Sequence, residues 1–184
     1  LVSSLNGMGA VFAREVGLSV AQISTFMAAA ILGGMLLQFP VGRLSDRFDR
    51  RTVLIAACLA TALAAYGVIR ASENGFEILL LAAIVMGGFG FTIYPVSSSQ
   101  VNDLADPDRL VQVAAGLLIA YGVGASLGPT VSAQFMSVLG PKGLFVYVIT
   151  IALILSLFTV VRMIQRRRGG KEKASFLPLG AIGV

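Results

Sequence analysis

Five long uncharged stretches determine what this chain can fold into. They contain no Asp, Glu, Lys or Arg, and they cover residues 16–42, 52–69, 78–102, 110–139 and 143–161. A helix needs about 20 apolar residues to cross a bilayer, and it satisfies its own backbone hydrogen bonds there. We therefore predict an all-α, polytopic transmembrane helix bundle with five complete spans. Residues 1–13 are apolar but too short to cross, and we interpret them as the end of a truncated first span.

The composition agrees with a lipid environment and excludes several classes of function. Hydrophobic residues make up 57% of the chain and charged residues 12%, against about half and about a quarter in soluble domains. The net charge of +5 comes from short basic clusters, without the basic and aromatic stripe of a nucleic-acid surface. There is no histidine, and the single cysteine, Cys58, is interpreted as a small buried or lipid-facing apolar residue. We expect the lipid bilayer as a partner, no nucleic acid, no metal or other cofactor, and no enzymatic activity.

Turn signals fall between the uncharged stretches. Gly17 followed by Ser19 and Gln22 predicts a helix end and then a capping box. Three further signals are Asn74-Gly75, Asp106-Pro107 and Gly140-Pro141. In the second of these, the aspartate is expected to be the N-cap and the proline the first helical residue.

The basic residues are distributed unequally between the two ends of the predicted bundle. If the spans alternate in direction, eleven lie at one end, in 43–51, at Arg109 and in 162–173. The other end receives Arg14, Arg70 and Lys142. Because cytoplasmic loops carry the excess of Lys and Arg, this asymmetry places the 43–51 loop and the C-terminus in the cytoplasm.

The segment Gly42–Leu54, here called the signature segment, carries the most specific pattern in the chain. It reads Gly-Arg-Leu-Ser-Asp-Arg-Phe-Asp-Arg-Arg-Thr-Val-Leu. This resembles the signature loop of the major facilitator superfamily of transporters, Gly-x-Leu-small-Asp-Arg-x-Gly-Arg-Arg/Lys-x-x-Leu. The matching positions are Gly42, Leu44, Asp46, Arg47, Arg50, Arg51 and Leu54. Asp49 stands where the family usually has glycine, which argues against a special backbone conformation there.

The chemistry of this segment suggests roles for its residues. Gly42 is expected to let a helix end turn sharply. Asp46 is expected to pair with an arginine or a helix N-terminus, since an unpaired carboxylate is costly near the membrane. The resemblance implies that this acid contacts the other half of a transporter and latches its cytoplasmic side shut, together with Gly42, Arg47, Arg50 and Arg51. For the arginines, a simple positive-inside anchor stays open as the alternative.

The position of the signature segment implies which part of a transporter the chain represents. In the superfamily it follows the second helix of each six-helix half, and here it follows the first complete span. The resemblance covers residues 1–168 and implies the C-terminal half, helices seven to twelve, with 169–184 as a mostly disordered cytoplasmic tail. The implied partner is the missing N-terminal half or, alternatively, a second copy of the chain in a parallel dimer.

Softer matches at 94–103, 116–118 and 121–129 are similar to a YcaD-like subgroup of bacterial transporters, which implies a bacterial inner membrane. Gly124 and Gly128 are four residues apart, so they share one helix face and permit close backbone approach. Pro129 would bend the same helix. Two interpretations stay open for these residues, a flexing point in alternating access or simple helix packing. The same two interpretations apply to the glycine cluster at 87–90.

The predicted spans contain uncharged polar residues that could line a substrate path. In transporters of this kind the substrate site lies near the midplane, between the two halves. Tyr121 is the best placed, because it lies near the middle of its span. The other candidates are Gln38, Tyr94, Gln134, Asn6 and Gln100. For each of them, hydrogen bonding between helices is the alternative to substrate contact. An apolar or weakly polar substrate would suit such a lining.

The resemblance favours a secondary active transporter that moves a small solute by alternating access. The sequence contains no phosphate-binding loop, so an ion or solute gradient is the expected energy source. With no charged residue inside a complete span, a proton-coupling carboxylate is expected in the missing half. The alternative is a transport-inactive membrane module that acts as a receptor or an assembly scaffold.

Overall fold

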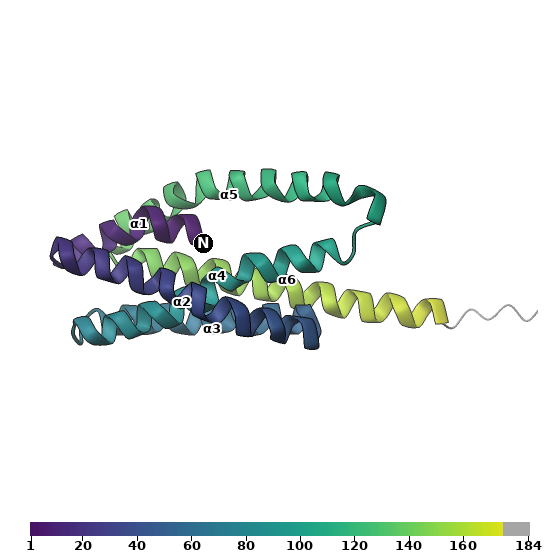
Figure 1. Cartoon of the computed structure of the whole chain (residues 1–184), viewed down its shortest axis with the longest axis horizontal. Coiled ribbons are helices and arrows are strands. Elements are labelled where there is room, and N and C mark those ends of the chain that lie inside the picture. Colours follow the sequence, from purple (N-terminus) through teal and green to yellow (C-terminus); the bar gives the residue numbers. More distant parts are fainter. Residues whose placement is uncertain (175–184) are drawn as a thin grey trace, which may run out of the picture.

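The chain forms an elongated bundle of α-helices (Figure 1). The computed structural model describes the backbone of residues 1–174 and the side chains of residues 1–106 and 108–165. The elements in this part are α1 Val2–Glu15, α2 Val20–Arg47, α3 Arg50–Ala71, α4 Phe76–Asn102, the 3-10 turn η1 Pro107–Arg109, α5 Leu110–Leu139 and α6 Gly143–Ala174. Five of them, α2 to α6, are long and apolar enough to cross a membrane. The predicted all-α bundle with five complete spans and a shorter first helix is confirmed.

Several helix ends coincide with the predicted signals. The Ser19 amide donates to Gln22 Oε1 at 2.9 Å and the Gln22 amide donates to the Ser19 hydroxyl at 3.4 Å, so the capping box that starts α2 is confirmed. Gly17 and Gly75 have φ angles of +88° and +113°, which residues with a side chain rarely adopt. These two glycines therefore permit the short α1–α2 and α3–α4 connections.

Two predicted boundaries differ in detail from the structure. Asp106 is the N-cap and Pro107 the first helical residue, as predicted, but of the 3-10 turn η1 rather than of α5, and the Asp106 side chain makes no capping hydrogen bond. The fixed φ of the proline is used in this turn, and α5 begins after it at Leu110. At the other end of the chain, α6 continues to Ala174, past the predicted boundary at 168. Residues 175–184 of the predicted tail lie outside the described residues.

Helices α2 and α4 form the most extensive helix pair, and glycines permit their close crossing. A Cβ on Gly33 of α2 would overlap the carbonyl group of Ile84, and a Cβ on Gly87 of α4 would overlap that of Ala30. The backbones of the two helices therefore pack directly on each other at this crossing. Gly88 also has no room for a side chain, because a Cβ there would overlap a side chain of α2.

Two clusters of buried side chains hold the other helices. At the end of the bundle far from the signature segment, the ring of Phe12 on α1 lies 5.8 Å from that of Phe26 and 4.6 Å from that of Phe145. The second of these pairs is nearly perpendicular, a favourable edge-to-face arrangement. Near the signature segment, Leu54 and Cys58 belong to a second cluster between α2, α3, α4 and α6. Cys58 is a free thiol and fully buried.

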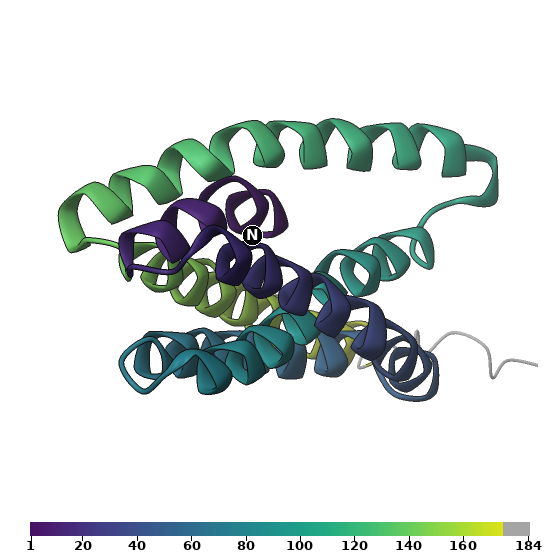
Figure 2. The same ribbon diagram turned by 60° about the vertical axis from the view of Figure 1, so that its left-hand side comes forward.

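Helix α5 departs from this close packing. Its buried residues are Gly128, Ser132 and Met136, in the part that meets α1 and α6. From Leu110 to Leu127 no residue of α5 is buried. In Figure 2 this half of the helix arches away from α4. The bundle is closed at the Phe12 end and splayed at the signature end.

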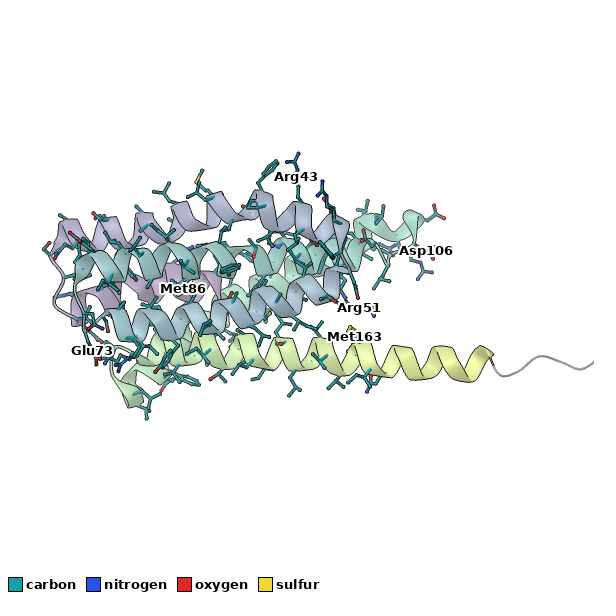
Figure 3. The ribbon with its side chains drawn as sticks, turned by 90° about the horizontal axis from the view of Figure 1, so that it is seen from below. Arg43, Arg51, Glu73, Met86, Asp106 and Met163 are labelled. Carbon is teal, nitrogen blue, oxygen red and sulfur yellow. The ribbon has the colours of Figure 1, made fainter. Side chains whose placement is uncertain are left out.

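Successive connections between the helices lie at opposite ends of the bundle. This is the alternation of spans that was assumed when the basic residues at each end were counted. Figure 3 shows Arg51 and Asp106 near one end and Glu73 at the other. At the Glu73 end, Lys142 of the α5–α6 connection donates a hydrogen bond to the Glu73 carboxylate, and Arg70 lies 3.6 Å from it. The bond from Lys142, with a smaller contribution from Arg70, lowers the pKa of Glu73. This contact joins two connections at the closed end of the bundle.

Candidate functional site

The signature segment is almost entirely helical. Helix α2 continues to Arg47 and α3 begins at Arg50, so Phe48 and Asp49 alone connect them. Gly42 lies inside α2, and the expectation that it ends a helix is wrong. A Cβ on Gly42 would meet no atom within 4 Å, so no close contact bends the helix at this point. The turn is made instead by Phe48, whose backbone is extended.

Asp49 takes the place of the family's usual glycine without strain. Its φ of −56° is open to any residue, so no glycine is required here. Its carboxylate accepts a hydrogen bond from the Arg51 amide at 3.2 Å and caps the start of α3. The departure from the family pattern therefore provides an N-cap.

Arg50 joins three helices at the signature end. Its Nε lies 2.7 Å from Asp103 Oδ2, directly after α4, and a terminal nitrogen lies 3.5 Å from Asp46 Oδ1 on α2. The side chain of Asp103 is 54% exposed and that of Asp46 is 70% exposed. Asp103 is the closer and better shielded partner. Asp46 therefore pairs with an arginine, but only loosely.

A small polar cavity of about 160 Å³ lies between α2 and α4 beside this cluster. Gln38, Ser45, Asp46 and Thr92 contribute to its wall. The Ser45 hydroxyl is buried and has no hydrogen-bond partner among the described residues. The cavity is large enough to admit water to this hydroxyl group.

Tyr94 of α4 and Tyr121 of α5, here called the tyrosine pair, meet on the splayed side of the bundle. Their ring centroids are 5.0 Å apart and their planes are tilted by 57°. The two side chains are 39% and 44% exposed. Helices α4 and α5 contact each other little, so this aromatic contact is a main link between them. Tyr121 lies near the middle of α5, at the depth of the bilayer interior.

Two larger cavities share the tyrosine pair. One, of about 280 Å³, lies between α1, α2, α4 and α5 and includes Met35 and Gln38. The other, of about 340 Å³, lies between α1, α4, α5 and α6 and includes Ser97 and Tyr147. Among the described residues, no Asp, Glu, Lys or Arg lines either cavity. Apolar walls with a few polar groups are typical of sites for weakly polar small molecules.

The other predicted substrate residues fall into different places. Gln38 lines both the small polar cavity and the 280 Å³ cavity, so it connects the tyrosine pair with the signature segment. Gln134 and Asn6 are exposed and line neither large cavity, because they lie on outward faces of α5 and α1. Gln100 lines a separate cavity with Arg51. The structure thus brings Gln38 to the tyrosine pair and leaves Gln134 and Asn6 outside.

The two glycines predicted to share a face of α5 have different surroundings. Gly128 is buried, and a Cβ there would lie 2.7 Å from the Ser4 hydroxyl of α1. The adjacent Pro129 packs against α1, since a Cβ on Gly7 would lie 3.3 Å from its ring. Gly124 has open space around it and lines the 340 Å³ cavity. Gly128 and Pro129 therefore pack against α1, whereas Gly124 stays free of close contacts.

Two contributors to this arrangement were missed in the sequence. Asp103 holds Arg50, and an acidic residue directly after a span at the basic end was the available signal. Gly33 is the counterpart of Gly87 in the α2–α4 crossing. The glycine doublet at 33–34 was visible, but its partner on α4 depends on how the two helices cross. Among the side chains of residues 1–106 and 108–165, no group of acidic or thiol side chains is arranged to hold a metal ion.

A comparison with protein families identifies the bundle. The model of the Major Facilitator Superfamily matches residues 2–181. This chain belongs to the major facilitator superfamily. It is therefore a multi-pass membrane protein of a transporter family, in agreement with its five apolar helices. The resemblance carried by the signature segment is confirmed.

Curated members of the superfamily match nearly the whole chain. The chain is 30% identical over 173 residues to the uncharacterized MFS-type transporter YcaD of Shigella flexneri serotype 5b (strain 8401). It is 29% identical over the same length to YcaD of Escherichia coli (strain SMS-3-5 / SECEC). Each match covers 94% of this chain and 43% of the relative. The chain thus spans less than half the length of these superfamily members, and the predicted similarity to YcaD-like transporters is confirmed.

Proposed function

We propose that this chain is the C-terminal half of a secondary active transporter that moves a small solute by alternating access. The observation that carries the proposal is the tyrosine pair, which lines two cavities between the helices near mid-span. In the superfamily the two halves are related by an axis along the membrane normal, and substrate binds near the midplane between them. Helices α1 to α6 then correspond to helices seven to twelve. An N-terminal half, or a second copy of this chain, supplies the facing wall.

The lining of the two cavities favours an uncharged, weakly polar substrate. A charged substrate at this depth would need an opposite charge, because burying an unpaired ion is costly. The tyrosine hydroxyls and the Gln38 amide offer hydrogen bonds that can orient a neutral molecule against the apolar wall. If transport is driven by protons, the coupling carboxylate comes from the N-terminal half.

Asp46 acts in this proposal as the latch of the signature end. Its carboxylate is 70% exposed and is held only by a 3.5 Å contact with Arg50, so it is free to meet the other half. Arg50 is fixed by Asp103, which keeps the start of α3 in place when the latch opens. Arg47 and Arg51 add positive charge at the same end, and Gly42 is part of the continuous helix that carries Asp46.

The proposed location is the bacterial inner membrane, with the signature end and the C-terminus in the cytoplasm. The excess of Lys and Arg at this end supports the orientation. A green fluorescent protein fused to the C-terminus should fluoresce, and alkaline phosphatase fused at the same position should be inactive. The opposite pair of results would reverse the orientation.

Ligand-dependent stability tests the substrate class. The transporter, with its N-terminal half, is heated with 2-phenylethanol or with its charged analogues phenylacetate and phenethylammonium. A neutral ligand present at about 100 times its Kd should raise the free energy of unfolding by about 2.7 kcal/mol. Tyr121→Ala should abolish this shift, and Tyr66→Ala, which alters an exposed tyrosine of α3 outside both cavities, should keep it. Stabilisation by a charged analogue, or a shift that survives Tyr121→Ala, would contradict the proposed site.

Thiol accessibility tests alternating access. In a Cys58→Ala background, Tyr121→Cys should react with a membrane-impermeant thiol reagent applied to either side of proteoliposomes. Asp46→Asn should increase the labelling from the signature side, because it weakens the latch. The matched variant Tyr66→Cys should not respond to Asp46→Asn. Labelling of residue 121 from one side alone, whatever the conditions, would favour a scaffold that does not transport.

A further inference from the structure

A cavity on the other side of the signature segment has a lining unlike that of the transport site. It has a volume of about 290 Å³ and lies between α3, α4 and α6. Two arginines line it, Arg51 from the start of α3 and Arg162 from α6. Figure 3 shows Arg51 and Met163, the chain neighbour of Arg162, close to this end of the bundle. The cavity therefore lies where a membrane changes from hydrocarbon to headgroups.

The two arginines bring positive charge to this cavity. Among the residues that the structure describes, no Asp or Glu belongs to its lining. Among the described side chains, neither Arg51 nor Arg162 forms an ion pair, whereas nearby Arg50 is paired with two acids. Two guanidinium groups that face one cavity repel each other unless an anion lies between them. The lining is thus complementary to a group with negative charge, and phosphate suits the planar donors of arginine.

The rest of the lining is apolar and open to the surroundings. Phe158 and Leu104 are 59% and 57% exposed, although both are large hydrophobic residues. The Arg162 guanidinium carbon lies 5.9 Å from the centre of the Phe158 ring, so this cation stands at the edge of an apolar surface. Leu155 continues the apolar wall toward the middle of the membrane. A ligand that fits this cavity has an anionic head and an apolar tail.

We propose that this cavity binds one anionic phospholipid from the leaflet at the signature end. The phosphate lies between Arg51 and Arg162, Gln100 hydrogen-bonds to the headgroup, and an acyl chain runs along Leu155 and Phe158. Basic pockets between membrane helices are known to bind anionic headgroups in this way. The site rests on the bilayer environment of the bundle and is independent of the proposed transport function.

Lipid retention tests this site in the purified transporter. Native mass spectrometry follows binding of a phosphatidylglycerol and of a phosphatidylcholine with the same acyl chains. The wild type should retain one phosphatidylglycerol in preference to phosphatidylcholine. Arg51→Gln or Arg162→Gln should weaken this binding about fivefold, and the double variant about thirtyfold, as expected for the loss of one or two arginines near an anionic lipid. Arg51→Lys and Arg162→Lys keep the charge and should retain most of the binding.

Arg109→Gln is the matched control, because Arg109 is an exposed basic residue at the same end but lies outside the cavity. This variant should leave the binding unchanged. If it weakens binding as much as the double variant does, the lipid recognises only the overall charge, and the site is disproved. Equal retention of phosphatidylcholine and phosphatidylglycerol by the wild type would also disprove the site. Inorganic phosphate should compete poorly, and full competition would show a simple anion site without a role for the apolar wall.

Thermal unfolding of each variant separates lost binding from lost folding. Both arginines lie at helix surfaces near the end of the bundle, so the double variant should melt within a few degrees of the wild type in detergent without lipid. Added phosphatidylglycerol should then stabilise the wild type and not the double variant. A double variant that is still stabilised as strongly as the wild type would overturn the proposal.

Discussion

Helices α4 and α5 have similar sequences but differ in how closely they pack against neighbouring helices. Both are long, apolar and rich in glycine, and both contain one internal proline, Pro95 in α4 and Pro129 in α5. Nine residues of α4 are buried, whereas three residues of α5 are. Helix α2 leaves no room for a side chain at Gly87 and Gly88 of α4, whereas a Cβ on Gly124 of α5 would meet open space. The α4 glycines therefore allow close packing against α2, whereas Gly124 makes no such close contact in the described part of the chain.

The difference separates a closely packed group of helices from a helix with few contacts in its first half. Helices α2, α3, α4 and α6 share the most extensive contacts, and the first half of α5 shares few. The tyrosine pair lies at their boundary, with one ring on α4 and one on α5.

The largest effect is expected when a side chain is added at the α2–α4 crossing. Gly87→Ala should lower the free energy of unfolding by about 3 kcal/mol or more, because the new Cβ overlaps the Ala30 carbonyl group and neither backbone can move alone. Gly124→Ala is the matched change on α5 and should be neutral or stabilise by up to about 1 kcal/mol. Unfolding of both variants in detergent measures the difference. Similar losses of stability in both variants would show that Gly87 and Gly124 are packed equally closely.

A smaller loss is expected where α5 does touch α1. Gly128→Ala should cost about 1 to 2 kcal/mol, because the added Cβ would lie 2.7 Å from the Ser4 hydroxyl and 3.0 Å from that of Ser3. These hydroxyl groups belong to side chains that can rotate, so the clash is partly relieved. The double variant Gly128→Ala with Ser4→Gly should recover most of the loss. If Ser4→Gly gives no recovery, the stability loss of Gly128→Ala does not come from the contact between α5 and α1.

Charge pairing at the signature end should contribute less than either glycine contact. Arg50 and Asp103 are partly exposed, and exposed ion pairs contribute at most about 1 kcal/mol. A double-mutant cycle with Arg50→Gln and Asp103→Asn should give a coupling energy of about 0.5 to 1 kcal/mol. The same cycle with Arg47→Gln in place of Arg50→Gln should give none. Equal coupling for both arginines would mean that the end is held by general charge attraction.

The weakest effect is expected at the closed end, through Glu73. The pKa of this carboxyl is lowered from its ordinary value of 4.5 by the hydrogen bond from Lys142. Its contribution to stability is therefore complete above pH 4.5 and is lost as the pH falls through the lower, folded-state pKa. Glu73→Gln should remove this part of the acid dependence in melting curves taken from neutral pH to about pH 3. An unchanged acid dependence would show that Lys142 does not hold the carboxylate in solution.

The spans were predictable because each depends on the local sequence. Charges interrupt the apolar stretches, and the Ser19 and Gln22 capping box and the Gly75 turn use neighbouring residues. The predicted fourth stretch, 110–139, has the bounds of α5 itself. Such features need no knowledge of what packs against the helix.

The contacts between helices were not predictable in the same way. A glycine in a span has the same appearance whether another backbone covers it, as at Gly87, or open space surrounds it, as at Gly42. Tyr94 and Tyr121 were identified as separate candidates, and their meeting depends on the crossing of α4 and α5. Asn6 and Gln134 were chosen for their chemistry, but the rotation of their helices turns them outward. The pairing of Arg50 with Asp103 likewise requires the ends of α3 and α4 to be adjacent.

Helix α6 extends beyond the other helices of the bundle. Its 32 residues from Gly143 to Ala174 extend for about 48 Å, which exceeds the roughly 30 Å of a bilayer interior. The excess continues past the signature end of the other helices (Figure 1). Because α6 packs along α3 over its first part, the two tilt together. In the proposed alternating-access cycle, a slight rotation of these two helices would therefore give a larger displacement at the end of α6, in the water beside the membrane.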